Sequence, residues 1–223
     1  MEQSTLFPAE KGHIGTDESG KGDYFGPLVI AGVFVPDGQD AVLRELGVKD
    51  SKRISDGRVR ELAEVIRKGY KHSVVSIGPE RYNELYGKLR NLNRLLAWGH
   101  SRVIENILED VHCSLAVTDQ FGDARFVVNA LMKKGKTIEL IQKPRAEEDM
   151  AVAAASVLAR AEFLKRLSHL SREMGVDLPK GSSPLAEGAG AKLVKLLGVE
   201  ALDKAAKKHF KLTDRILSQI GGR

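Results

Sequence analysis

The stretch Gly15-Thr-Asp-Glu-Ser-Gly-Lys-Gly-Asp-Tyr-Phe-Gly-Pro27 places two adjacent acids directly before a glycine-rich turn. The apolar run Leu-Val-Ile-Ala-Gly-Val-Phe-Val follows at 28–35 and predicts a buried strand. Two carboxylates held side by side next to a buried strand are costly to place unless a cation neutralises them. Asp17 and Glu18 therefore indicate the first half of a divalent-metal site.

The same stretch is similar to a phosphate-binding P-loop, but three features argue against that function. Residues 15–22 read G-x-x-x-x-G-K-G, whereas a P-loop needs Ser or Thr after the lysine to hold magnesium. Asp17 and Glu18 would put negative charge inside a cradle of backbone N–H groups. The helix expected at the lysine is also missing, because residues 27–35 read as a strand. A nucleoside triphosphatase is therefore not the favoured interpretation. Such an enzyme would be recognised because a bound nucleotide would stabilise the protein.

The composition indicates a globular protein of the reducing cytoplasm. The chain has 223 residues, of which 42% are hydrophobic and 29% charged, so it can bury a sizeable core. The net charge of +5 permits a nucleic-acid partner without establishing one. The single cysteine, Cys113, excludes an intramolecular disulfide and a cysteine metal cluster. No apolar segment approaches about 18 residues and no signal peptide is recognisable, so we expect no membrane association.

The order of the predicted elements indicates an α/β fold with a mixed β-sheet flanked by helices. Strands are expected at 13–16, 28–35, 70–77, 114–118 and 137–141, the first two as an antiparallel hairpin. Helices are expected at 41–46, 56–68, 92–108 and 150–174, after Pro79, between 119 and 137, and in pieces over the last forty residues. The helix at 92–108 should bury Leu95, Leu96, Trp98, Val103, Ile104 and Ile107. A tail at 1–12 and a single domain at 13–223 complete the predicted organisation.

Further acids occur where predicted elements begin or end. Asp119 ends the fourth strand, and Glu147 and Glu148 open the long helix. Ligand sites of α/β proteins collect at strand ends, so we expect these acids to face a common edge with Asp17 and Glu18. Hard cations bind a few carboxylates, and water and substrate oxygens complete the coordination. Two magnesium ions about 3.5–4 Å apart hold the attacking water and the leaving oxygen in phosphodiester hydrolysis.

The later acids also have purely structural interpretations. Asp119 is equally consistent with the N-cap of a following helix. Glu147 and Glu148 are consistent with a favourable interaction with the helix dipole. The small residues at 151–156 should let the long helix pack close to the sheet, which also determines where Glu147 points.

Five ordered motifs resemble the type 3 ribonucleases H (ribonuclease HIII). They are 17–27, Gly47-Val-Lys-Asp-Ser-Lys52, Asp119-Gln-Phe121, Lys143-Pro-Arg-Ala-Glu147 and Ala153-Ala-Ala-Ser-Val-Leu-Ala-Arg160. The match continues through 170–175 and 178–181 and runs from about residue 13 to about residue 215. The resemblance implies an RNase H-like fold with a helical C-terminal part. It also implies endonucleolytic cleavage of the RNA strand of RNA/DNA hybrids with Mg²⁺ or Mn²⁺, leaving 5′-phosphate and 3′-hydroxyl ends.

Carried over residue by residue, the resemblance assigns catalysis and metal binding to Asp17, Glu18, Asp119 and Glu147. Glu148 is the substitute for the fourth acid, because the segment after Glu147 is one residue shorter than the usual family pattern. Substrate binding is expected from Gly20, Lys21, Gly22, Lys52, Lys143 and Lys180. The two glycines would let the backbone approach the minor groove, where 2′-hydroxyls distinguish RNA from DNA. The lysines would hold phosphates, although each is equally consistent with a surface charge.

The chain departs from related families at two places. Type 2 ribonucleases H carry Gly-Arg-Gly and Lys-Gly-Tyr, where this sequence has Gly20-Lys-Gly22 and Lys180-Gly-Ser-Ser. We therefore expect weak activity at a single ribonucleotide embedded in DNA. Type 3 enzymes usually carry an N-terminal TBP-like domain, for which a twelve-residue tail is too short. We expect a monomer whose affinity rests on the basic residues of the catalytic domain.

Three other functions remain as alternatives. The first is a type 2-like ribonuclease H that cuts at single embedded ribonucleotides. The second is a non-catalytic nucleic-acid binding module, which would have no use for four converging acids. The third is a DNA-directed nuclease or transposase-like enzyme with the same metal core. Only the choice of substrate distinguishes it from the hybrid-cleaving enzyme.

Overall fold

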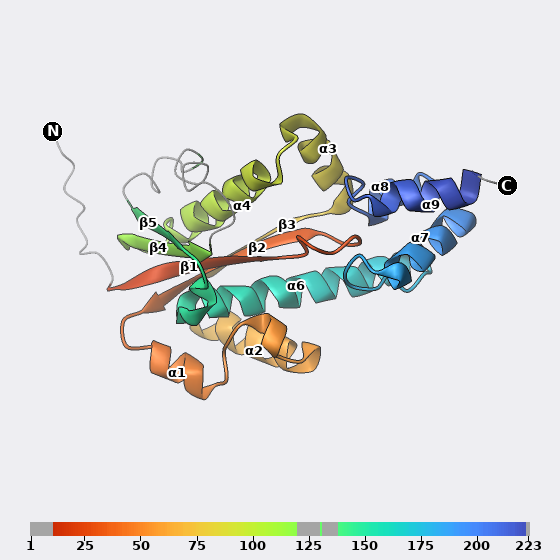
Figure 1. Ribbon diagram of the computed structural model, residues 1–223. Coiled ribbons are helices and arrows are strands. Elements are labelled where there is room, and N and C mark those ends of the chain that lie inside the picture. Colours follow the sequence, from red (N-terminus) through yellow and green to blue (C-terminus); the bar gives the residue numbers. More distant parts are fainter. Residues whose placement is uncertain (1–10, 120–129, 131–137, 222–223) are drawn as a thin grey trace. The chain divides into compact units, whose positions relative to one another are not determined.

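The computed structural model describes residues 11–119, 130 and 138–221 (Figure 1). The chain forms two compact units. The first contains residues up to Asp17, Ile30–Val75 and Leu96–Ala159, and the second contains Glu18–Val29, Ser76–Leu95 and the chain from Arg160 onward. The helix expected between 119 and 137, residues 120 and 121 of the third motif, and most of the N-terminal tail lie outside the described residues.

A five-stranded sheet forms the centre of the fold, with the strand order β3-β2-β1-β4-β5. The strands are β1 (Gly12–Ser19), β2 (Leu28–Pro36), β3 (His72–Ile77), β4 (Leu115–Asp119) and β5 (Glu139–Lys143). β4 pairs in parallel with both β1 and β5. Residues 20–27 are too few for a parallel crossover, so the neighbouring strands β1 and β2 form an antiparallel hairpin. The predicted mixed sheet is thereby confirmed.

Burial along the strands follows from their places in the sheet. Residues 28–35 of β2 are all buried, which explains why this strand reads as a continuous apolar run instead of alternating. β5 lies at the edge of the sheet and alternates between exposed and half-buried residues. It begins two residues later than predicted, at Glu139.

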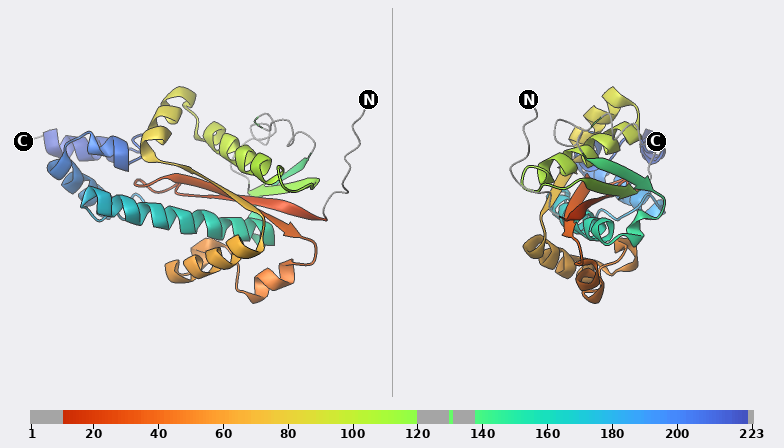
Figure 2. Two further views of the ribbon diagram at one scale, coloured as in Figure 1. Left: turned by 180° about the vertical axis from the view of Figure 1, so that it is seen from behind. Right: turned by 90° about the vertical axis from the view of Figure 1, so that its left-hand side faces the viewer.

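Helices cover both faces of the sheet in the first unit. α2 (Asp56–Gly69) buries Val59, Leu62, Ala63 and Ile66 as one stripe, as its periodicity predicts. α4 (Leu92–Ile107) lies over one face, whereas α2 and the first part of α6 (Met150–Met174) lie over the other (Figures 1 and 2). α1 (Asp40–Glu45) and the short 3-10 helix η1 (Ser51–Arg53) connect β2 to α2.

The start of α6 packs against β1 with almost no space between their backbones. Residues 151–155 are fully buried, and all except Val152 are alanines. A Cβ atom added to Gly15 of β1 would lie 2.1 Å from both the carbonyl carbon of Ala151 and the amide nitrogen of Val152. Only glycine fits at this crossing, and the small-residue run of α6 serves the close packing that its sequence predicts.

The second unit contains the helical C-terminal part that the sequence predicts. Its helices are α3 (Pro79–Leu89), the remainder of α6, α7 (Pro184–Leu197), α8 (Ala201–Ala205) and α9 (Leu212–Gly221). α7 packs on α8 and α9, and α8 packs on α3. Among the described residues, no helix is long and apolar enough to cross a membrane.

Two local predictions are wrong. Trp98 is 41% exposed, because it shares one polar face of α4 with Arg102 and Asn106 at a spacing of four residues. Glu147 and Glu148 do not open the long helix but form a separate 3-10 turn, η3 (Ala146–Glu148). The helix begins after Asp149, whose carboxylate Oδ1 accepts the N–H groups of Ala151 at 3.0 Å and Val152 at 3.2 Å and so acts as its N-cap.

Candidate metal centre and its surroundings

Two of the predicted acids follow matched positions on neighbouring parallel strands. Thr16 of β1 pairs with Thr118 of β4, so Asp17 and Asp119 come next on the two strands, at the same edge of the sheet. Both side chains line one cavity of about 250 Å³ in the first unit, together with Glu147. The structure thus brings three of the four predicted acids to a single cavity.

Glu147 reaches this cavity through the geometry of the turn that carries it. Arg145 adopts a left-handed conformation (φ 56°, ψ 39°) and turns the chain from β5 into η3. The following Ala146 is fully buried in a cluster with Val117 and Val152, and its N–H donates to Asp119 Oδ1 at 3.5 Å. The lining residues of the cavity include Glu147 but not Glu148, the substitute considered from the sequence.

The remaining acid, Glu18, belongs to the second unit as the next residue of β1. Its carboxylate Oε1 accepts a hydrogen bond from Lys21 Nζ at 3.2 Å. The side chain of Glu18 is largely buried, at 11% exposure, whereas that of Lys21 is 40% exposed. This lysine of the glycine-rich loop therefore partly neutralises the second acid of the motif.

The donor set at the cavity fits a hard divalent cation. Every candidate ligand is a carboxylate, the group that Mg²⁺ and Mn²⁺ prefer. In the part of the chain that the structure describes, no three Asp, Glu, His or Cys side chains lie close enough to hold a metal by themselves. Mg²⁺ usually keeps several waters and binds one or two carboxylates plus substrate phosphates. The cavity therefore fits an ion whose coordination water and substrate would complete.

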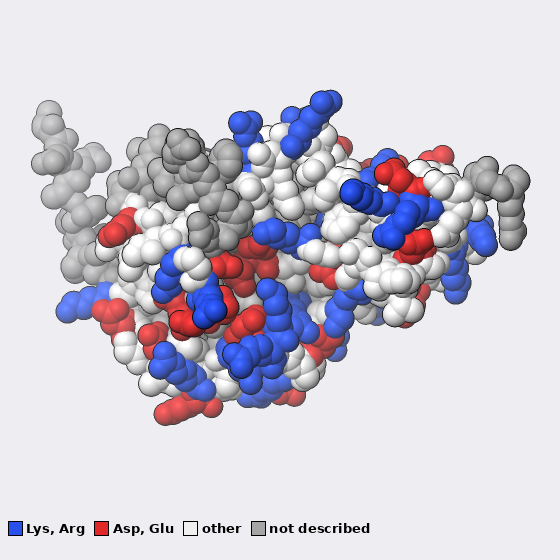
Figure 3. All heavy atoms as spheres, in the orientation of Figure 1, with Lys and Arg blue, Asp and Glu red and all other residues white. Residues whose placement is uncertain are grey.

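Basic side chains border the acids. Lys52, predicted to hold phosphate, lines the same cavity, and so do Arg145 and Asp50. η1 is tied to α6 through Ser51, whose hydroxyl is 2.8 Å from that of Ser156. Figure 3 shows acidic and basic side chains close together over the start of α6.

Sequence reasoning missed Arg145 and Asp50. Both lie inside the quoted motifs, beside Lys143 and Lys52, but nothing in their spacing distinguishes them from surface residues. Their place in the cavity depends on the left-handed turn at Arg145 and on the contact between η1 and α6. Lys143 lies outside the set that lines the cavity, with its Nζ 4.0 Å from Asp149 Oδ2.

An ion pair secures the start of α6 next to the cavity. His13 Nε2 lies 2.9 Å from Asp149 Oδ1. Burial opposes the ionisation of Asp149, but the hydrogen bond with His13, the positive charge of His13, the N–H of Val152 and the charge of Lys143 together lower its pKa. The same hydrogen bond raises the pKa of His13 against the opposing effect of its own burial. The cap of α6 is therefore held as a carboxylate that also contacts β1.

A buried histidine lies behind the two strand ends. His100 of α4 is fully buried, and its Nδ1 is 2.8 Å from the hydroxyl of Thr16 and 3.4 Å from that of Thr118. Each of these threonines directly precedes one of the candidate metal ligands. Because side chains alternate along a strand, the threonines point to the face that α4 covers. One imidazole therefore contacts both strands immediately before their acids.

The other predicted substrate-binding residues gather in the second unit. Gly20 has φ +89°, and a Cβ there would lie 2.1 Å from the carbonyl oxygen of Pro27, whereas the space around Gly22 is open. Asp23 N donates to Gly20 O at 3.3 Å, which closes the loop. Asp23 Oδ1 also accepts the N–H of Gly181 at 2.6 Å. This contact brings Lys180, the neighbour of Gly181, to the Gly20–Gly22 loop.

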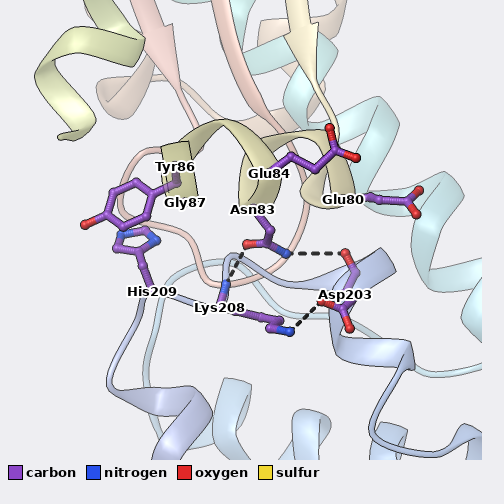
Figure 4. A pocket seen from close by; sticks show the side chains of 8 residues that line it. All are labelled: Glu80, Asn83, Glu84, Tyr86, Gly87, Asp203, Lys208 and His209. Carbon is purple, nitrogen blue, oxygen red and sulfur yellow. Dashed lines mark hydrogen bonds and ion pairs between the residues drawn. The ribbon is translucent and has the colours of Figure 1, made fainter. Parts of the chain in front are cut away.

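The second unit also has a separate pocket that contains none of the predicted site residues. Its volume is about 610 Å³ (Figure 4). The lining residues are Glu80, Asn83, Glu84, Tyr86, Gly87, Asp203, Lys208 and His209. Several of them bond one another, for example Lys208 Nζ to Asp203 Oδ1 at 2.6 Å. The pocket lies where α3 contacts α8 and the segment that follows it.

Comparisons with known proteins agree with this architecture. Residues 14–213 match the family described as Ribonuclease HII. The chain is 47% identical to Ribonuclease HIII of Protochlamydia amoebophila, covering 94% of this chain and 69% of that protein. It is 45% identical to Ribonuclease HIII of Chlamydia pneumoniae, covering 92% and 70%.

Solved structures show the same likeness. The crystal structure of Bst-RNase HIII in complex with Mn²⁺ is similar with a TM-score of 0.88 and 31% identity, covering 96% of this chain and 72% of that one. Aquifex aeolicus RNase H3 is similar with a TM-score of 0.73 and 34% identity, covering 91% and 73%. The chain therefore belongs to the ribonuclease HII family of Mg²⁺- or Mn²⁺-dependent ribonucleases H, and within it to the ribonucleases HIII that its motifs resemble.

Proposed function

We propose that this ribonuclease H cuts the RNA strand of RNA/DNA hybrids by two-metal-ion catalysis and leaves 5′-phosphate and 3′-hydroxyl ends. The observation that carries the proposal is the single cavity lined by Asp17, Asp119 and Glu147 and bordered by Lys52 and Arg145. Carboxylates suit divalent ions and basic side chains suit the phosphates of a nucleic acid. The enzyme is expected to act as a monomer.

In this proposal Asp17, Glu18, Asp119 and Glu147 hold the metal ions. When bound, these ions lower the pKa of an attacking water and stabilise the charge that develops on the leaving 3′-oxygen. Lys52 and Arg145 orient the scissile phosphate through charge-assisted hydrogen bonds. Placing the phosphate beside the carboxylates makes the reaction effectively unimolecular.

The Gly20–Gly22 loop supplies the selectivity for RNA. The space beside Gly22 is open, so its backbone is accessible to the 2′-hydroxyls of the minor groove. Lys21 and Lys180 hold phosphates of the hybrid, and Lys143 contributes a further positive charge. Because these contacts are electrostatic, the affinity for the hybrid should fall as the salt concentration rises.

An end-labelled RNA/DNA hybrid, compared with a DNA duplex that contains one ribonucleotide, tests this function. With Mg²⁺ or Mn²⁺ we expect cleavage at several positions of the hybrid and little cleavage at the lone ribonucleotide, because no tyrosine follows Lys180-Gly181. EDTA should abolish both activities. Efficient cutting at the lone ribonucleotide would support the type 2-like alternative. Binding without cleavage under all metal conditions would support the non-catalytic alternative.

Substitution of His100 tests whether the imidazole behind the strands matters for the chemistry. His100→Phe keeps an aromatic ring but removes the nitrogen that contacts the hydroxyls of Thr16 and Thr118. The strand ends that carry Asp17 and Asp119 can then shift. We expect kcat to fall about tenfold while KM for the hybrid stays unchanged, because substrate contacts remain in place. Steady-state kinetics at a temperature well below the melting transition measures this split. A fall in stability with unchanged kcat would show that His100 is only a packing residue.

A further inference from the structure

Lys207 is a fully buried lysine in the segment that follows α8. Its Nζ donates to three backbone carbonyl oxygens, those of Asp23 at 2.8 Å, Phe25 at 3.3 Å and Gly26 at 2.7 Å. Its backbone N–H donates to a fourth carbonyl, that of Tyr24, at 2.9 Å. One residue near the C-terminus therefore binds every carbonyl from 23 to 26.

The bound carbonyls belong to the short connection directly after the Gly20–Gly22 loop. Asp23 closes that loop through its N–H bond to Gly20 O at 3.3 Å. The same aspartate holds Gly181, and with it Lys180, through the 2.6 Å contact of its carboxylate. A shift of Asp23 would therefore move Lys21 on one side and Lys180 on the other.

Burying the amino group of a lysine is energetically costly, so the presence of a lysine at this position needs an explanation. Burial lowers the pKa of Lys207 to about 7, and the charge of Asp23 opposes this effect. The backbone pairing of this region does not require the lysine side chain. Phe25 bridges to Ala206, and Gly26 N donates to Ala205 O at 3.0 Å. What the side chain adds is one shared donor to the carbonyl oxygens of Asp23, Phe25 and Gly26.

The segment that carries Lys207 is itself held in place from α3. Asn83 Nδ2 donates to Ala206 O at 2.9 Å, and Asn83 Oδ1 accepts the N–H of Lys208 at 2.9 Å. These two bonds flank Lys207 on both sides, and Figure 4 shows Asn83 between α3 and this segment. The backbone of Lys207 is thus held from α3 as well as by its bond to Tyr24 O.

We propose that Lys207 is a positioning residue for substrate binding, which holds the Gly20–Gly22 loop and Lys180 in the arrangement that binds the sugar–phosphate backbone of the hybrid. This inference rests on the proposed function of the loop. Lys207 does not touch the substrate, since its side chain is fully buried. Its effect is transmitted through Asp23.

The test compares Lys207→Met with Lys208→Met on the RNA/DNA hybrid. Both variants replace the amino group of a lysine by the apolar end of a long side chain, but the exposed Lys208 contacts Asp203 instead of residues 23–26. For Lys207→Met we expect KM to rise about tenfold with kcat within about twofold of the wild type, because only the substrate-binding loop is loosened. Lys208→Met should leave both constants close to those of the wild type. Equal KM values for the two variants, measured well below their melting temperatures, would overturn the proposal.

A double-mutant cycle with Lys21→Ala separates this inference from the proposed function. If Lys207 acts by positioning Lys21, the double variant should have nearly the same KM as the worse single variant. If Lys21→Ala raises KM and Lys207→Met does not, the loop binds substrate but Lys207 is not its positioning residue. If neither variant changes KM, the assignment of substrate binding to the loop fails, and this inference fails with it.

A second variant keeps the test decisive if Lys207→Met does not fold. Asn83→Ala removes the two bonds that flank Lys207 and leaves the lysine itself in the chain. We expect KM to rise, by a smaller factor than in Lys207→Met, with kcat retained. A folded Asn83→Ala variant with wild-type KM would then count against the positioning role.

Discussion

Replacement of Asp119 by Asn is expected to reduce cleavage of the RNA/DNA hybrid by at least about 10³-fold, because losing one group that stabilises transition-state charge typically costs 10²–10³ and a metal ligand adds to this. Asn keeps the shape of the side chain and can still accept the weak 3.5 Å contact from Ala146 N. The fold should therefore survive. Asp17→Asn is expected to behave in the same way, since both residues line the same cavity.

Initial cleavage rates with Mg²⁺, together with the thermal melting temperature, measure these effects. Glu147→Gln and Glu148→Gln form a matched pair, because they change neighbouring residues of the same turn by the same chemistry. Glu147→Gln should be strongly impaired, whereas Glu148→Gln should stay near the wild type, since only Glu147 lines the cavity. The reverse result would move the fourth ligand to Glu148. Near-normal activity in Asp17→Asn or Asp119→Asn would refute the metal-site assignment itself.

Gly15→Ala is expected to lower the free energy of unfolding by about 3 kcal/mol or more, at the upper end of what overpacking costs. The added Cβ would lie 2.1 Å from backbone atoms of Ala151 and Val152. Backbone atoms cannot rotate away as a flexible side chain can, so β1 or α6 would have to move. That movement would also displace Asp17, two residues further along β1, and activity should fall even below the melting temperature.

Gly57→Ala is the control for this prediction. Gly57 lies in α2, and nothing is within 4 Å of a Cβ added there. Alanine is the better helix former, so this variant should gain about 0.5–1 kcal/mol. Urea unfolding followed by circular dichroism gives both values. A Gly15→Ala variant as stable as the wild type would show that β1 and α6 are not as closely packed as described.

Much of the fold could be predicted from local patterns. The apolar run at 28–35 is a buried strand, and the long helix has its predicted bounds, Met150 and Met174. These features follow from the local pattern of apolar residues, which one segment carries by itself. The prediction failed where the neighbourhood decided the outcome. Trp98 is exposed on the polar face of α4. Glu147 and Glu148, expected to open the long helix, form a separate 3-10 turn before the cap that Asp149 provides.

For the candidate site, too, the identity of the residues and their arrangement have different origins. The sequence by itself determined which acids to consider, because adjacent carboxylates before a glycine turn have few structural uses and the ordered motifs are specific to one family. Only the tertiary structure decided which of them meet. Asp17 and Asp119 come together through the parallel register of β1 and β4, and Arg145 joins them through a left-handed turn. Lys207 contacts the carbonyl oxygens of Phe25 and Gly26, which lie more than 180 positions earlier in the sequence. Such pairings depend on the packing of distant segments, and no local spacing encodes that.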